Sequence, residues 1–177
     1  MSQLRVIVGV TGGIAAFKSA ALVSQLVQAD VDVRVVMTAA ASRFIGEATF
    51  AALSGHPVAT RAVDDANYPL GPHIELADIA DVMCVAPATA NFLAKAAHGV
   101  ADDVLATLYL AFPKRVLVAP AMNSQMWAHP AVQRNVAQLQ SDGVQIIAPE
   151  EGWLSCRREG TGRMASPESI CQLILEP

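Results

Sequence analysis

Short runs of apolar residues, rich in Val and Ile, recur along this chain and restrict its fold more than any other feature. Examples are Val6–Val10, Val82–Ala86 and Arg115–Ala119, each followed by a turn of small residues and then by a helix-like stretch. Strands that do not alternate apolar and polar residues are typically buried on both faces, as in parallel sheets covered by helices on both sides. The pattern therefore predicts an α/β fold: a doubly wound, Rossmann-like parallel sheet sandwich in a single domain.

The same periodicity places the other elements. We predict strands at Val6–Val10, Val31–Met37, Pro57–Thr60, Val82–Ala86, Arg115–Ala119 and Val144–Ile147, and helices at Ile14–Gln28, Phe44–Leu53, Ile74–Ala80, Asn91–Ala97, Asp102–Ala111, Ala131–Ser141 and Ser166–Leu175. Ser166 followed by Pro167 is a typical helix start, with a capping side chain before proline at the first helical position. In such folds ligands bind beyond the carboxyl ends of the strands.

Residues 149–164 are the exception to this alternation. They hold three glycines and three arginines together with Cys156, and they show no periodicity. Loops of this length in compact domains are usually lids or binding loops, although a merely mobile surface loop is the alternative. We expect a flexible flap at about residues 149–164.

The composition restricts the partners of the chain. Hydrophobic residues make up 53% of its 177 residues and charged residues 16%, with a mean hydropathy of +0.38. No run approaches the ~20 apolar residues of a membrane-spanning helix, so we expect no membrane partner and a symmetric homo-oligomer that buries the apolar excess. The net charge of −4 and the lack of a Lys/Arg cluster argue against nucleic acid. The first apolar run is too short for a signal peptide, which favours the cytoplasm.

The cysteines give no sign of a disulfide framework. Cys84, Cys156 and Cys171 are odd in number and widely spaced. Neither a Cys-x-x-Cys motif nor a His pair at metal-ligand spacing accompanies them, so we predict free thiols and no metal site.

The first candidate site is the strand-to-helix turn at Gly12 and Gly13. Its glycines let the backbone approach an anion, and the free N–H groups at the helix start can hold a phosphate. Thr38 and Ser42, after the neighbouring strand, could add hydroxyl donors. The alternatives are that the turn needs glycine for steric reasons and that the hydroxyls cap a helix.

Two further turns follow buried strands. Residues 87–92 offer small side chains and an amide, namely Ala88, Thr89, Ala90 and Asn91, which leave room for a flat ring system unless Asn91 is only a helix cap. Residues 120–127 place Met122, Asn123 and Met126 at the same edge, as an apolar pocket with one polar group. Met and Trp on their own would more often belong to the core.

His73 is a candidate acid or base, since it stands directly before a predicted helix. A lone histidine is more often a capping or surface residue. His56, His98 and His129 look the same in isolation, so spacing does not choose among the four.

Four motifs in this order resemble the flavin-dependent cysteine decarboxylase family, and the likeness covers nearly the whole chain. Residues 120–127 match the family's P-x-M-N-x-x-M-W in full, and residues 87–92 match four of the six positions of P-A-S-A-N-T, with Thr89 and Phe92 as the departures. His73 falls on the histidine of H-I-x-L. Residues 152–156 and 160–164 resemble the family's mobile, cysteine-bearing flap.

The resemblance implies a Rossmann-like flavoprotein that binds FMN and acts as a carbon-carbon lyase. Its reaction would be the redox-neutral decarboxylation of 4′-phosphopantothenoylcysteine to 4′-phosphopantetheine in coenzyme A biosynthesis. The resemblance implies that His73 is the acid/base, that Asn123 binds the substrate carboxylate and that Cys156 is the proton donor. The residues implied at the FMN phosphate are Gly12, Gly13, Thr38 and Ser42, and those implied near the flavin ring are Phe44, Ala88, Thr89, Ala90 and Asn91. The residues implied to contact the substrate are Met122, Met126 and Arg163.

The resemblance leaves alternatives open. Some relatives are peptidyl-cysteine decarboxylases that stop at an oxidised enethiol, and others are non-catalytic FMN-binding regulatory subunits. Cys156 in the flap favours the complete reaction. Related flavin prenyltransferases carry a different first loop, which argues against them. The family forms trimers, sometimes stacked into dodecamers, with the site at the subunit boundary, and its bacterial members often continue into a ligase domain.

Overall fold

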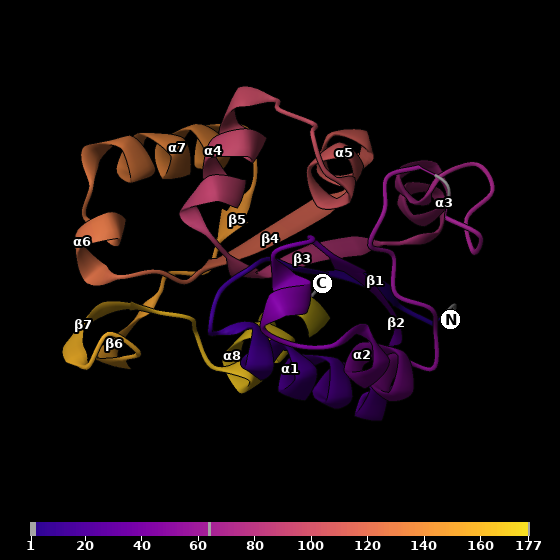
Figure 1. Ribbon diagram of the computed structural model, residues 1–177, viewed down its shortest axis with the longest axis horizontal. Helices are drawn as coiled ribbons and strands as arrows, with labels where there is room; N and C mark the ends of the chain where they lie inside the picture. The colour runs from indigo at the N-terminus through magenta and orange to yellow at the C-terminus, as the bar shows by residue number, and fades with distance from the viewer. Residues whose placement is uncertain (1–2, 64, 177) are drawn as a thin grey trace.

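A computed structural model describes residues 3–63 and 65–176 and contains a three-layer α/β fold (Figure 1). A parallel sheet lies between two layers of helices. Its strands are β1 (Arg5–Val10), β2 (Asp32–Met37), β3 (Val82–Ala88), β4 (Arg115–Pro120) and β5 (Gln145–Ile146), and the helices are α1 (Ala16–Gln28), α2 (Glu47–Ser54), α3 (Pro72–Ile79), α4 (Ala90–His98), α5 (Val104–Ala111), α6 (Ser124–Trp127), α7 (Pro130–Ser141) and α8 (Pro167–Leu175). The predicted α/β class is confirmed.

The strand order is β2-β1-β3-β4-β5, and every pairing in this sheet is parallel. The chain moves outward from β1 to β2 and then crosses to the other side of β1 to form β3. The point between β1 and β3 is therefore the topological switch of the sheet, where doubly wound proteins bind ligands. The turns that follow β1 and β3 carry the predicted glycines and the predicted Thr89.

Both faces of the sheet are buried, as the Val/Ile runs predict. All seven residues of β3 are buried. Helices α1, α2 and α8 cover one face, and α3, α4, α5 and α7 cover the other (Figure 1). Alternate residues of β1 contribute to the two cores, Val6, Val8 and Val10 to the first and Ile7 to the second. Burial on both faces explains why the strand sequences do not alternate.

The segment 149–164 differs from the expectation of an aperiodic loop. It forms an antiparallel hairpin of β6 (Glu150–Leu154) and β7 (Arg158–Arg163), with Cys156 in the turn between them. Its three glycines remove the alternation by which a strand is recognised in a sequence, which is why the prediction missed both strands.

Smaller corrections concern the ends of elements. Residues 57–60 form no strand and contribute only an isolated bridge between Val36 and Ala59. The helix expected from Phe44 begins at Glu47, after a 3₁₀ turn at Ala41–Arg43. The four-residue helix α6 was not predicted. Ser166 caps α8 as predicted, since its Oγ accepts a hydrogen bond from Ser169 N at 3.1 Å. None of the described helices has the length and apolar character needed to cross a membrane.

Candidate functional site

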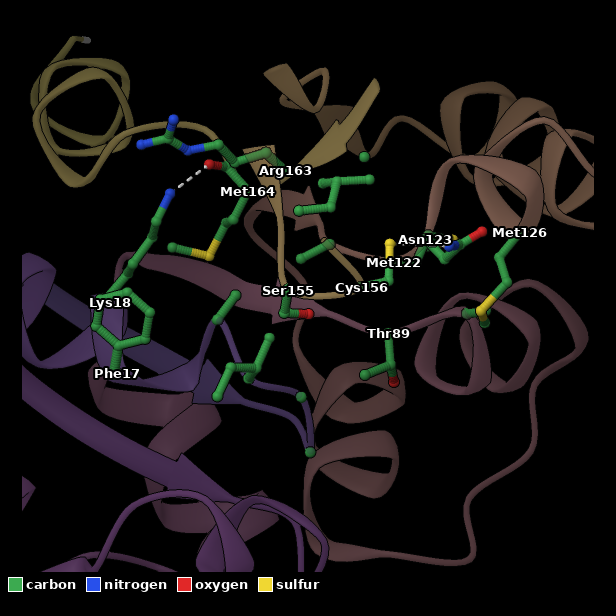
Figure 2. A pocket seen from close by; sticks show the side chains of 18 of the residues that line it. Phe17, Lys18, Thr89, Met122, Asn123, Met126, Ser155, Cys156, Arg163 and Met164 are labelled. Atoms are coloured by element: carbon green, nitrogen blue, oxygen red, sulfur yellow. Dashed lines mark hydrogen bonds between the residues drawn. The ribbon is translucent and has the colours of Figure 1, made fainter. Parts of the chain in front are cut away.

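A cavity of about 600 Å³ opens at the switch point of the sheet (Figure 2). Its wall comes from the turn after β1, the first turn of α1, the turns after β3 and β4, and the β6–β7 hairpin. The lining residues are Gly12, Gly13, Ile14, Ala15, Phe17, Lys18, Thr89, Ala90, Ala121, Met122, Asn123, Met126, Trp153, Leu154, Ser155, Cys156, Gly162, Arg163 and Met164. The cavity is thus mainly apolar with a few polar groups, as is usual for a small-molecule site.

The two glycines of the first turn have different roles. A Cβ atom on Gly12 would lie 2.4 Å from Ala40 Cβ, so glycine is needed there for steric reasons alone. A Cβ atom on Gly13 would meet nothing closer than Thr89 Cγ2 at 3.7 Å and would project into the cavity. The protein itself therefore does not require glycine at 13, and a ligand lying against the backbone would.

Thr11 joins the turns after β1 and β3. Its Oγ1 donates a hydrogen bond to Pro87 O at 2.6 Å and accepts one from Thr89 N at 3.1 Å. Thr89 Oγ1 in turn accepts a bond from Phe92 N at 3.3 Å and caps α4. The alternative role of Asn91 as a cap is therefore wrong, because Thr89 fills that position and Asn91 is exposed. Sequence reasoning missed Thr11, although a hydroxyl at the end of an apolar strand is a usable signal.

Asn123 and Cys156 meet across the cavity mouth. Asn123 Oδ1 caps α6 by accepting a hydrogen bond from Gln125 N at 2.9 Å. This bond fixes the amide so that its Nδ2 faces Cys156 Sγ at 3.4 Å. The side chain thus presents an N–H donor to the cavity next to a thiol. The two residues come from segments 33 positions apart in the chain.

The base of the hairpin is seated closely on the turn after β4. Met122 N donates a hydrogen bond to Gly162 O at 2.9 Å. Gly162 has φ +147°, and a Cβ atom there would lie 2.2 Å from Met122 O. A Cβ atom on Gly160 would lie 2.9 Å from Ser124 Oγ. These glycines let β7 lie against residues 122–124, and the same hairpin carries Cys156, which contacts Asn123.

Two cations line the same cavity, Lys18 of α1 and Arg163 of β7. Lys18 Nζ donates a hydrogen bond to Met164 O at 3.0 Å. Burial lowers the pKa of the Lys18 amine, and the charge of Arg163 lowers it further, whereas Glu150 and Glu168 raise it. Sequence reasoning selected Arg163 but missed Lys18, along with Phe17, Trp153 and Met164, because nothing in their local sequence shows that they face a cavity.

The other residues predicted to bind the cofactor, namely Thr38, Ser42, Phe44, Ala88 and Asn91, are not among the residues that line this cavity. Ala88 is buried in the core, whereas Ser42, Phe44 and Asn91 are exposed. Thr38 Oγ1 accepts a bond from Ala41 N at 3.3 Å, which fits its alternative capping role.

His73 lies in the first turn of α3, at the opposite end of the molecule from the hairpin (Figure 1). Its Nδ1 is buried and finds no hydrogen-bond partner among the described residues. The structure therefore brings Gly12, Gly13, Thr89, Ala90, Met122, Asn123, Met126, Cys156 and Arg163 together in one chain, and leaves His73 apart from them.

A cavity at the switch point of a flavodoxin-like strand order is the position at which flavin mononucleotide binds in doubly wound folds. The family model described as "Flavoprotein" matches residues 1–177, and the chain belongs to this family. The chain is 47% identical over 173 residues to the coenzyme A biosynthesis bifunctional protein CoaBC of Bacillus subtilis (strain 168), covering 98% of this chain and 43% of that protein. It therefore spans less than half the length of this curated relative.

Two solved structures share the fold over almost their full length. The FMN-dependent cysteine decarboxylase SpaF has a TM-score of 0.85 and 39% identity, with 98% of this chain and 96% of that chain covered. A cysteine variant of PPC decarboxylase complexed with pantothenoylaminoethenethiol has a TM-score of 0.86 and 30% identity, with 98% and 97% covered. The resemblance seen in the sequence motifs is confirmed.

Proposed function

We propose that this chain is an FMN-dependent decarboxylase, a carbon-carbon lyase that converts 4′-phosphopantothenoylcysteine to 4′-phosphopantetheine in coenzyme A biosynthesis. The observation that carries the proposal is the Asn123 amide fixed 3.4 Å from the Cys156 thiol over a flavoprotein cavity. The similarity to CoaBC and to PPC decarboxylase supports this substrate.

The residues present fit FMN. Gly13 leaves room for a ligand against the backbone of the turn after β1, and Ala15, the N-cap residue of α1, places no side-chain cap there. We assign the phosphate of FMN to Gly12, Gly13, Thr38 and Ser42, and the surroundings of its ring to Phe44, Ala88, Thr89, Ala90 and Asn91. FMN, when bound, would supply reversible hydride transfer, a reaction that protein side chains cannot carry out on their own.

Asn123 serves the decarboxylation step through its fixed N–H. The amide donates a hydrogen bond to the substrate carboxylate and orients it in the cavity. A neutral donor suits this role better than a cation, because a full positive charge would stabilise the carboxylate in the ground state and slow the loss of carbon dioxide. Met122 and Met126 provide the apolar wall around the bound substrate.

Cys156 serves the last step. Its thiol holds a proton at Sγ beside Asn123 and delivers that proton to the decarboxylated product. The hairpin acts as a flexible flap, so that Cys156 approaches the substrate once it is bound. The glycines that seat β7 define the closed position of this flap.

His73 completes the cavity of a neighbouring copy in a homo-oligomer, either a trimer or a dodecamer built from trimers. Two observations support this arrangement: His73 lies apart from the cavity of its own chain, and its Nδ1 is buried without a partner among the described residues. Ile14, Phe17, Phe44 and Leu70 are each at least half exposed, which leaves apolar surface for such contacts. There His73 acts as acid/base at the substrate thiol. We place the assembly in the cytoplasm, with no nucleic-acid or membrane partner.

A second candidate is an oxidative cysteine decarboxylase that stops at the enethiol. The chain is 39% identical to SpaF, which is described as an FMN-dependent cysteine decarboxylase and not as a PPC decarboxylase. A non-catalytic FMN-binding regulatory subunit is a weaker alternative, because His73, Asn123 and Cys156 are all present.

One experiment separates the three functions. The purified FMN-loaded protein is incubated anaerobically with 4′-phosphopantothenoylcysteine, and the product is identified by mass spectrometry. A product mass that corresponds to loss of carbon dioxide alone, and therefore to the saturated thiol, supports the proposed reaction. Loss of carbon dioxide together with two hydrogens would show the oxidative reaction, and unchanged substrate would favour the regulatory subunit.

A further inference from the structure

Positive charge accumulates at one end of the cavity. Lys18 and Arg163 lie together on one side of it, and Asn123 and Met126 lie on the other side (Figure 2). The wall between them is apolar and includes Ala121, Leu154 and Met164. The cavity therefore has one cationic end and one end that carries the amide and thiol pair.

The position of Lys18 is electrostatically unfavourable for the isolated chain. It stands in the first turn of α1, where the helix dipole presents partial positive charge and where acidic side chains are the favoured residues. The sequence of this turn contains neither Asp nor Glu, and its N-cap residue Ala15 offers no side-chain acceptor. Burial lowers the pKa of the Lys18 amine most, and the charge of Arg163 lowers it further.

The described residues do not neutralise these two cations. Neither Lys18 nor Arg163 forms a salt bridge of 4.0 Å or less within residues 3–63 and 65–176. Glu150 and Glu168 act on Lys18 from further away, and each has an oxygen engaged elsewhere: Glu150 accepts a bond from Ser166 N at 2.9 Å, and Glu168 accepts one from Gln25 Nε2 at 2.8 Å. Two cations that line one cavity thus have no ion-pair partner in the part of the chain that the structure describes.

We propose that Lys18 and Arg163 form a subsite for a phosphate monoester, and that its occupant is the phosphate of the substrate. This inference rests on the proposed function. A substrate with a carboxylate at one end and a phosphate at the other then spans the cavity, with Asn123 and the cationic pair as its two anchors. Because Arg163 and Cys156 belong to the same hairpin, the phosphate also holds in place the segment that carries the proton donor.

FMN carries a phosphate of the same chemistry, and the test must distinguish the two sources. The full chain loaded with FMN is assayed with 4′-phosphopantothenoylcysteine and with pantothenoylcysteine, which lacks the phosphate. The variants are Lys18→Gln and Arg163→Gln, with Arg158→Gln as the matched control, since Arg158 is an exposed arginine of β7 outside the cavity lining. FMN and riboflavin affinities are measured for every protein, and the flavin content and unfolding temperature verify folding.

The wild-type protein is expected to prefer the phosphorylated substrate. Each cavity variant is expected to lower its kcat/KM by about 10- to 100-fold, the range of one charge-assisted hydrogen bond, and to change that of pantothenoylcysteine by less than about twofold. Arg158→Gln should leave both values unchanged. FMN affinity should stay at the wild-type value.

Other results overturn the subsite in distinguishable ways. Equal use of both substrates by the wild-type protein would leave the proposed function standing and remove the phosphate subsite. Weaker FMN binding with unchanged riboflavin binding in the variants would assign the cations to the cofactor phosphate instead. If the FMN-loaded wild-type protein decarboxylates neither substrate, the proposed function fails and the substrate assignment fails with it.

Discussion

At the scale of single residues, local hydrogen bonds decide what a side chain can do in the site. Asn123 has its oxygen occupied by the N-cap bond to Gln125 N, so only its N–H groups remain for a ligand. Cys84 and Cys156 are both free thiols, as predicted, yet their surroundings are opposite.

The reactivity of the cysteines follows from their burial. Complete burial raises the pKa of the Cys84 thiol to about 12, because the apolar core disfavours the thiolate. Below that pH the group stays protonated and unreactive, whereas Cys156 is exposed. Iodoacetamide at neutral to mildly basic pH is expected to alkylate Cys156 and to spare Cys84. Peptide mass spectrometry measures the sites, with urea-unfolded protein as the control in which both react; alkylation of native Cys84 would contradict its burial.

Replacing Cys156 separates decarboxylation from the final reduction. Cys156→Ser is expected to release carbon dioxide and to accumulate the oxidised enethiol, since serine is a far weaker acid than the thiol. The saturated product should fall by about two orders of magnitude or more, as expected for loss of a general acid. Anaerobic product analysis measures both species. A wild-type yield of saturated product would place the proton donor elsewhere.

Alanine substitutions at Gly12 and Gly13 are expected to affect different properties, the stability of the fold and the binding of FMN respectively. Gly12→Ala is expected to destabilise the fold by about 1–3 kcal/mol, because the new methyl group collides with Ala40. Gly13→Ala should leave the free energy of unfolding nearly unchanged and weaken FMN binding, since its methyl group enters the cavity. Denaturant unfolding of the FMN-free protein and flavin titration measure the two effects. Unchanged FMN affinity in Gly13→Ala would remove this turn from the cofactor site.

At the scale of elements, the β6–β7 hairpin has the clearest functional role. Its tip carries Cys156, and its base is fixed to the turn after β4 by the bond from Met122 N to Gly162 O. The sequence suggested a flap over these residues but not its regular structure, because glycine interrupts the strand pattern.

Gly162→Ala tests the seating of this hairpin. A Cβ atom at 2.2 Å from Met122 O is not tolerated, and the φ of +147° is strained for alanine. We expect the hairpin to move off the turn, with FMN content retained and formation of saturated product reduced at least about tenfold. Hydrogen exchange of residues 150–163 should rise. Gly46→Ala is the control, since a Cβ atom there meets nothing within 4 Å; equal behaviour of the two variants would contradict the seating.

At the scale of the whole molecule, the three residues proposed to act in the reaction do not all lie at the cavity of one chain. The cavity contains Asn123 and Cys156, while His73 lies at the far end of the molecule with a buried and unsatisfied Nδ1 among the described residues. A symmetric assembly of identical chains can bring these groups together, since each copy then supplies what its neighbour lacks.

Complementation between inactive variants tests this arrangement. His73→Asn and Asn123→Asp are each expected to bind FMN and to lose turnover. When the two are co-expressed, about a quarter of the boundaries in random mixed oligomers combine an intact His73 with an intact Asn123, so about a quarter of wild-type activity should return. Separately purified variants mixed without exchange serve as the control. Absence of recovery in verified mixed oligomers would place His73 in the site of its own chain or outside any site.

The sequence by itself determined the class of the fold, most element positions and the turns that hold the site. Unbroken Val and Ile runs specify strands buried on both faces, and motifs at the strand ends fix which residues reach the ligand edge, as Asn123 and Thr89 show. Only the tertiary structure decided that Cys156 meets Asn123, that Lys18 joins Arg163 at one end of the cavity, and that His73 lies apart. These relations depend on contacts between segments distant in the chain, and local propensity and periodicity carry no information about such contacts.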